Sequence, residues 1–226
     1  MTNSTAFDVV LLAFPGLTQL DLTGPFELFA RLPGARLTVA AKVAGPIKAD
    51  TGLILHADAS YAQVERADLL FVPGGYGQIA QMEDADTLAF LGRVGAEARW
   101  VTSVCTGALL LGAAGLLRGY RAATHWMYQD LLAAYGAIAT AERVVIDRNR
   151  MTAGGVTAGI DFGLQVIAEV AGPEAAQQAQ LELEYDPQPP FACGHPRSAP
   201  PALVDAVRAR FAARLSRRRA QTTAPA

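Results

Sequence analysis

Short runs of apolar residues alternate along this chain with segments in which apolar residues recur every three or four positions. Three runs are almost continuously apolar, as in strands buried on both faces of a sheet: residues 8–14, 68–73 and 99–104. The segments of helical period are residues 85–96, 106–117, 127–135 and 158–171. Strands that alternate with helices predict right-handed crossovers, and therefore an α/β fold with a mostly parallel sheet between two layers of helices.

The remaining segments predict how the chain is organised. Residues 37–58 and 142–152 have the pattern of strands and turns, with a turn at residues 147–149. No internal repeat or linker interrupts the sequence. We therefore expect a single domain over residues 1–226, with its core at about residues 8–183.

The C-terminal part has a different composition. Residues 186–201 contain six prolines and predict an extended arm, and residues 220–226 predict a disordered tail. Between them, a helix is predicted over residues 202–219, because apolar residues recur at steps of three, four and four: Val204, Val207, Phe211 and Leu215. Its other face is rich in arginine. A docked helix with a solvated basic face is the preferred interpretation over an arm that binds nucleic acid.

Composition narrows the function classes. Of the 226 residues, 51% are hydrophobic and 18% charged, which excludes a disordered chain. The formal net charge of −2 argues against a nucleic-acid partner. Mean hydropathy is +0.21, yet the longest apolar stretch, residues 104–117, has only 14 residues, so no membrane span is expected. No signal peptide is visible. Two cysteines make no disulfide framework, and a reducing, cytoplasmic setting is predicted.

Cys105 is the residue that points most clearly to chemistry. It follows a predicted strand and precedes a predicted helix that opens with Thr106 and Gly107. Such a turn can hold a side chain on a strained elbow at the carboxyl edge of a sheet. The amides and the partial positive charge at the start of the helix favour the thiolate, which is the nucleophilic form of cysteine. A buried cysteine that only fills space is the alternative.

Three loops are predicted beside Cys105, because the carboxyl ends of parallel strands meet at one edge of the sheet. Gly74 and Gly75, followed by Tyr76, have amides suited to an oxyanion site beside the amide of Thr106, although a tight turn also explains these glycines. Asp21 lies among leucines, which predicts partial burial and a raised pKa suited to proton transfer; a helix N-terminal carboxylate is the alternative. The third loop, residues 152–161, either lines the pocket or only begins a helix.

The histidines give weaker signals. His125 follows Cys105 by twenty residues, but the sequence shows no carboxylate to orient it, so a catalytic and a structural role are equally supported. His56 is predicted on a surface strand. Cys193 and His195 provide two ligands where a zinc site needs four, so no metal is expected. Neither a phosphate-binding loop nor a dinucleotide fingerprint is present.

Five blocks of the sequence carry a resemblance to a known family. They are Asp21–Glu27, Val72–Gly75, Ser103–Ala108 with Gly115–Leu117 and Ala123–Trp126, Thr152–Asp161, and Leu183–Pro190. Together they resemble the DJ-1/PfpI superfamily over residues 9–191, and the last block resembles an extension of one subgroup. The resemblance implies a flavodoxin-like fold of the class I glutamine amidotransferase type, a cysteine at the elbow, and a homodimer.

Within the superfamily, the combination of Asp21, Cys105 and Thr106 resembles the isonitrile hydratase subgroup. The DJ-1 branch has a glutamate in place of Asp21, and the PfpI protease branch has a histidine in place of Thr106. The combination also resembles the amino-terminal domains of AraC-type transcription regulators. Those proteins continue into a DNA-binding region of about a hundred residues, whereas only 25 residues follow Pro201 here.

The resemblance implies a cofactor-free hydratase that converts isonitriles and water to N-substituted formamides through a cysteine thioimidate. Cys105 would be the nucleophile, Asp21 the proton donor and base, and Thr106 a group that positions substrate or water. Substrate-binding residues would be Gly24, Gly74, Gly75, Tyr76 and Thr157, with His125 as a further candidate. Two alternatives remain: a glyoxalase or deglycase activity, and a non-enzymatic stress sensor in which Cys105 is oxidised.

Overall fold

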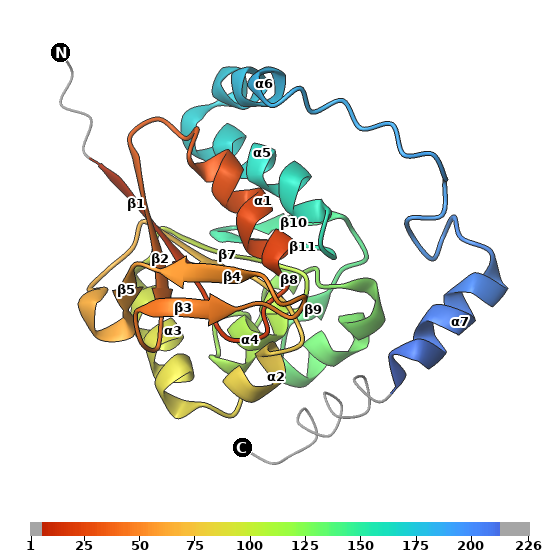
Figure 1. Cartoon of the computed structure of the whole chain (residues 1–226), viewed down its shortest axis with the longest axis horizontal. Helices are drawn as coiled ribbons and strands as arrows, with labels where there is room; N and C mark the ends of the chain where they lie inside the picture. Colours follow the sequence, from red (N-terminus) through yellow and green to blue (C-terminus); the bar gives the residue numbers. More distant parts are fainter. Residues whose placement is uncertain (1–5, 213–226) are drawn as a thin grey trace.

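The computed structural model, which describes residues 6–212, is built around a seven-stranded sheet (Figure 1). The strand order is β10-β11-β7-β6-β1-β2-β5. β10 and β11 pair antiparallel at one edge, and the other neighbours pair parallel. The strands are β1 (Phe7–Leu12), β2 (Ala35–Ala41), β3 (Gly45–Lys48), β4 (Ile54–Ala57), β5 (Ala59–Ser60), β6 (Leu69–Val72), β7 (Trp100–Val104), β8 (Arg121–Ala122), β9 (Ile138–Ala139), β10 (Val144–Asp147) and β11 (Arg150–Ala153).

Helices cover both faces of this sheet, as the alternating pattern predicts. α1, α5 and α6 pack together on one side, while α2, α3 and α4 lie on the other (Figure 1). The helices are α1 (Gln19–Phe29), α2 (Gln78–Gln81), α3 (Ala85–Glu97), α4 (Gly107–Ala113), α5 (Ala158–Ala171), α6 (Pro173–Glu182) and α7 (Pro201–Arg210), with the 3₁₀ segments η1 (Tyr61–Gln63) and η2 (Trp126–Tyr135).

Aromatic side chains tie the helices to the sheet. Phe29 of α1 and Phe162 of α5 are fully buried, and both contact Phe71 of β6. Their ring centroids lie 5.6–6.1 Å apart, two of the three pairs in edge-to-face geometry, which is a favourable arrangement for aromatic rings. This packing places the N-terminal ends of α1 and α5 at the carboxyl edge of the sheet.

The three strands predicted in the central sheet are confirmed, with ends within two residues of those expected, and larger differences lie outside the sheet. The helix expected over residues 106–117 ends at Ala113, and Gly115 follows with a φ of +76°. The helix expected over residues 127–135 is a 3₁₀ segment. α6 was not expected from the pattern, and it covers α5 with a small apolar stripe that includes Ala176 and Ala179.

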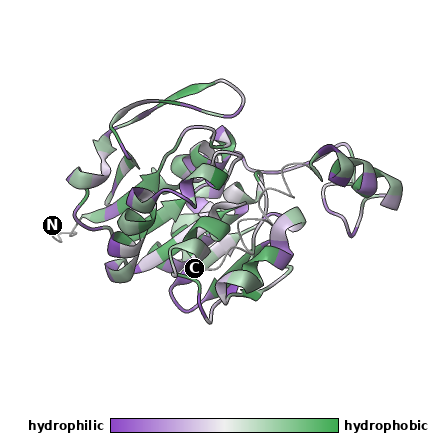
Figure 2. Cartoon of the chain, turned by 90° about the horizontal axis from the view of Figure 1, so that it is seen from below, coloured by the Kyte–Doolittle hydropathy of each residue, from purple (hydrophilic) through white to green (hydrophobic). Residues whose placement is uncertain are grey.

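The C-terminal helix also differs from the prediction of a docked helix. α7 has no buried residue and lies apart from the sheet and its covering helices (Figures 1 and 2). Its contact with the body of the protein includes the Arg208 guanidinium, 5.4 Å from the ring centre of Trp126. The rest of the helix predicted to residue 219, and the predicted tail at 220–226, lie outside the described residues. In the part of the chain that is described, every helix is too short or too polar to cross a bilayer.

Candidate active site

Cys105 stands on a strained turn between β7 and α4. Its φ is +53°, a conformation that side chains other than glycine rarely adopt and that marks functional sites when the surroundings enforce it. Here hydrogen bonds to both the amide and the carbonyl of Cys105 hold this conformation. The Cys105 amide donates to the carbonyls of Ala153 and Gly154, at 3.0 and 2.8 Å. The Cys105 carbonyl accepts a 2.7 Å hydrogen bond from the hydroxyl of Thr124.

Close packing of α4 against the sheet depends on Gly107. A Cβ at this position would lie 2.2 Å from the carbonyl oxygen of Val72. The absence of a side chain at Gly107 therefore allows α4 to approach the sheet closely. Cys105 itself is only 6% exposed, so a reactant reaches its thiol in a largely water-excluded position.

Asp21 meets Cys105 from the first turn of α1. The carboxyl group is fully buried, and Oδ2 accepts a 3.0 Å hydrogen bond from the amide of Gly74. The carboxyl also interacts with the thiol of Cys105, while within residues 6–212 no N–H or O–H group donates to Oδ1. Burial raises the pKa of Asp21 to about 7, against the opposing effects of Cys105 and Gly74. The predicted burial and raised pKa are confirmed, and the carboxyl bonds Gly74 rather than its own helix.

Gly74 marks the point at which three functional groups converge. A Cβ at Gly74 would lie 2.6 Å from the amide nitrogen of Thr106, and 2.8 Å both from Oδ2 of Asp21 and from Cβ of Cys105. These distances are too short for any side chain. The position therefore requires glycine, and the requirement comes from the site rather than from turn geometry.

Thr106 and Gly75 bond each other across the same edge. The amide of Gly75 donates to Oγ1 of Thr106 at 3.1 Å, and the Thr106 hydroxyl lies 3.4 Å from the Gly75 carbonyl. We expected the amides of Gly74 and Gly75 at an oxyanion site. In this structure they are directed to Asp21 and Thr106, because these two polar side chains are buried beside them.

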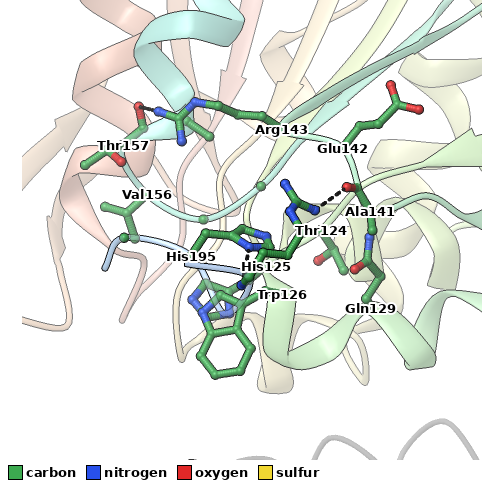
Figure 3. Close-up of a pocket in the computed structure, with 15 residues that line it drawn as sticks. Thr124, His125, Trp126, Gln129, Ala141, Glu142, Arg143, Val156, Thr157 and His195 are labelled. Atoms are coloured by element: carbon green, nitrogen blue, oxygen red, sulfur yellow. Dashed lines mark hydrogen bonds between the residues drawn. The ribbon is translucent and has the colours of Figure 1, made fainter. Parts of the chain in front are cut away.

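The other residues predicted to bind substrate are Tyr76, Gly24, Thr157 and His125. Tyr76 is 37% exposed at the start of the loop that leads to α2. Gly24 lies in α1, where a Cβ would stand 3.7 Å from Ile160 of α5. Thr157 precedes α5, and His125 precedes η2; both line a cavity of about 280 Å³ (Figure 3).

This cavity adjoins the elbow on the side of β11. Thr124 and Gly154, which bond the backbone of Cys105, are among its lining residues. Figure 3 shows Val156 and Thr157 on one side and Thr124 and Gln129 on the other. The predicted arm closes the cavity with Gly194, His195 and Arg197. Sequence pattern alone indicated neither Thr124 nor Arg197 beside this cavity.

The sequence of residues 8–169 matches the model of the DJ-1/PfpI family. This chain belongs to the DJ-1/PfpI family. It is 48% identical to the isonitrile hydratase of Pseudomonas putida, over 94% of this chain and 93% of that protein. The crystal structure of a THiJ/PfpI family protein from Pseudomonas syringae superposes with a TM-score of 0.95 at 43% identity, covering 97% of this chain and 92% of that one. The flavodoxin-like α/β fold expected from the resemblance is confirmed.

Another relative is named as a transcriptional regulator. The HTH-type transcriptional regulator CdhR of Pseudomonas aeruginosa is 32% identical over 62% of this chain, which corresponds to 42% of that protein. The match to the regulator is confined to part of its length, whereas the match to the hydratase extends over nearly all of both proteins.

The sequence also indicated histidines and a second cysteine as candidates. His56 is exposed on β4, as predicted, and Cys193 is exposed in the arm. Within residues 6–212, no three side chains of the metal-ligating types come together. His125 accepts a 3.3 Å hydrogen bond at Nδ1 from the amide of Met127, so its imidazole caps the start of η2.

Proposed function

We propose that this protein hydrates isonitriles to N-substituted formamides, with Cys105 as nucleophile and Asp21 as the group that moves protons. The observation that carries the proposal is the buried contact between the Asp21 carboxyl and the thiol on the elbow. A carboxyl that keeps its proton near neutral pH is suited to protonate carbon during nucleophilic attack. The extensive similarity to an isonitrile hydratase supports this substrate class.

The reaction begins with one proton shared between Asp21 and Cys105. The thiolate attacks the terminal carbon of R–N≡C, and Asp21 gives its proton to the same carbon. An S–C and a C–H bond form, and the product is the thioimidate R–N=CH–S–Cys. No proton enters from bulk water in this step, which suits a thiol that is 6% exposed.

Water completes the second half. The Asp21 carboxylate takes a proton from water as the oxygen bonds to the thioimidate carbon, and this proton passes to nitrogen. The hydroxyl proton then returns to Asp21 while the C–S bond breaks. The formamide R–NH–CHO leaves, and the protonated Asp21 and the thiolate are restored. The Thr106 hydroxyl, held by Gly75, positions the attacking water beside this carbon.

We further propose a cellular compartment and an oligomeric state for the active protein. A reducing cytoplasm keeps Cys105 as a thiol rather than an oxidised acid. The active form is a homodimer, as in the family that the chain resembles. Sedimentation of the purified protein tests the dimer directly, since a monomer of 23.8 kDa is resolved from its dimer by this method.

The proposed reaction is tested with purified, reduced protein and cyclohexyl isocyanide, with the formamide detected by NMR. We expect turnover in the wild type, none in Cys105→Ala, and a severe loss in Asp21→Asn with the fold retained. Cys193→Ala is the matched control, because this second cysteine is exposed in the arm, and it should keep full activity. Wild-type protein that forms no formamide would overturn the proposal, and turnover of methylglyoxal would then identify a glyoxalase.

A further inference from the structure

The cavity beside the elbow contains a cation without an acidic partner. Arg197 lines the cavity, and its Nη1 donates a 3.0 Å hydrogen bond to the carbonyl of Ala141. Among the described residues no carboxylate lies within ion-pair distance of this guanidinium. A guanidinium has five N–H donors in a planar fork that matches a carboxylate, and the backbone carbonyl occupies only part of it.

The other charged groups at this cavity are already neutralised. Arg143 is paired with Asp161 and donates to the carbonyl of Thr157 at 3.3 Å. Glu142 lies 3.6 Å from Arg121, its side chain is 57% exposed, and its carboxyl group points away from the histidines in Figure 3. Arg197 therefore determines the sign of the charge that the cavity presents.

Both histidines at the cavity accept a backbone hydrogen bond at Nδ1. Nδ1 of His195 accepts a 3.0 Å hydrogen bond from the amide of Arg197, and Nδ1 of His125 accepts one from the amide of Met127. Desolvation and the nearby Arg197 lower the pKa of His195, which favours its neutral form. In a neutral imidazole the proton then sits on the other nitrogen, so the His195 ring carries its N–H at Nε2. A ligand that offers only acceptor atoms, and a negative charge, complements this lining.

The lining of the same cavity includes two residues that bond the backbone of the nucleophile. Thr124 donates to the Cys105 carbonyl, the Gly154 carbonyl accepts from the Cys105 amide, and both residues line the cavity. We propose that this cavity binds the carboxylate of a substrate whose isonitrile carbon lies at Cys105, and that the protein therefore favours isocyanoalkanoates over uncharged isonitriles. This inference rests on the proposed hydratase function and adds its substrate class.

The kinetic test compares isocyanoalkanoates of two to four carbons with their methyl esters and with cyclohexyl isocyanide. We expect higher kcat/KM for one of the carboxylates than for its ester. In Arg197→Gln the KM for that carboxylate should rise at least about tenfold, as for the loss of one charge-assisted hydrogen bond, with cyclohexyl isocyanide unaffected. Arg36→Gln is the control, because Arg36 is a surface residue paired with Asp8, and it should change neither.

A binding measurement separates this inference from the proposed function. The N-formyl amino acids that correspond to these carboxylates are titrated into the protein by calorimetry, with the N-formyl methyl esters as controls. Binding of the acids that is lost in Arg197→Gln supports the carboxylate site whether or not turnover occurs. Equal binding of acids and esters, or an Arg197→Gln change that is the same for charged and uncharged substrates, overturns it. Absence of formamide from every isonitrile tested, charged and uncharged, counts only against the hydratase.

Discussion

The amide nitrogen of Gly74 lies 3.0 Å from Oδ2 of Asp21, although the two residues are 53 positions apart in the chain. This hydrogen bond holds the carboxyl against the elbow. Gly74→Ala is expected to abolish activity, by at least about a hundredfold, because its methyl group would have to displace Asp21, Cys105 or the Thr106 amide. Steady-state kinetics and a melting curve distinguish loss of the site from loss of the fold.

Gly92 provides the matched control for this substitution. It lies within α3, and a Cβ there would meet no atom within 4 Å. Gly92→Ala should keep full activity and raise the free energy of unfolding by up to about 1 kcal/mol, since alanine is the better helix former. A Gly74→Ala protein as active as Gly92→Ala would contradict the convergence described at Gly74.

The buried carboxyl predicts an unusual dependence of stability on pH. The pKa of Asp21 is raised from 3.8 to about 7 in the folded protein. Between these values the folded state holds a proton that the unfolded state has lost. The contribution of Asp21 to the free energy of unfolding therefore falls as pH rises from about 4 to about 7, by on the order of 4 kcal/mol in total, and is constant above that range.

Asp21→Asn isolates this effect. The amide oxygen can still accept from Gly74, but the residue no longer titrates. Urea unfolding of both proteins across this pH range should show the wild type losing stability relative to the variant as pH rises. Asp84 and Asp147, whose pKa values are lowered by Lys42 and Arg148, act in the opposite sense, but they contribute equally to both proteins and cancel in the difference. Parallel pH profiles would contradict the raised pKa.

The hydroxyl of Thr124 is predicted to be as important for activity as for stability. Thr124→Val leaves the Cys105 carbonyl without its 2.7 Å donor, so we expect a loss of about 1–3 kcal/mol in unfolding free energy and at least about a tenfold loss in kcat. Thr102→Val removes an equally buried hydroxyl, which bonds the Leu70 carbonyl at 2.9 Å. It should cost similar stability and leave kcat unchanged. Equal effects on kcat would exclude a positioning role for Thr124.

Backbone strain at the nucleophile gives a prediction that needs no substrate. Cys105 has a φ of +53°, a conformation that glycine adopts without steric cost and alanine does not. Cys105→Gly should therefore be more stable than Cys105→Ala, by about 1 kcal/mol, in reversal of the usual order. Chemical unfolding of both inactive variants measures it, and an alanine variant of equal or higher stability would show that the turn relaxes.

The sequence predicts a site residue well when the residues that determine its environment are its neighbours in the chain. Cys105 could be placed on an elbow because the strand before it and the Thr106–Gly107 pair after it are adjacent in the chain. The burial of Asp21 follows from its leucine neighbours, which belong to the same helix and the loop before it. In both cases the environment that matters lies within a few residues, so the pattern of the segment contains it.

Thr124 and Arg197 show where this reasoning stops. Each acts on a group far away in the sequence, the Cys105 carbonyl and the Ala141 carbonyl, and only the packed chain brings them together. η2 was predicted as an ordinary helix because periods of 3.0 and 3.6 residues are hard to distinguish over nine positions. α6 was not predicted because its buried face consists of alanines, which give a weaker apolar pattern than large aliphatic side chains.

The spacing of these contacts has a consequence for how the protein acquires its activity. Asp21 meets Gly74 across 53 positions, Gly75 meets Thr106 across 31, and Thr124 meets Cys105 across 19. Each pair is non-local, and such contacts in parallel sheets form late and slowly during folding. Only a segment that spans Asp21 to Thr124 contains all three pairs. The return of Cys105-dependent turnover after dilution from denaturant should therefore coincide with the slowest folding phase, which makes catalysis a readout of the completed sheet.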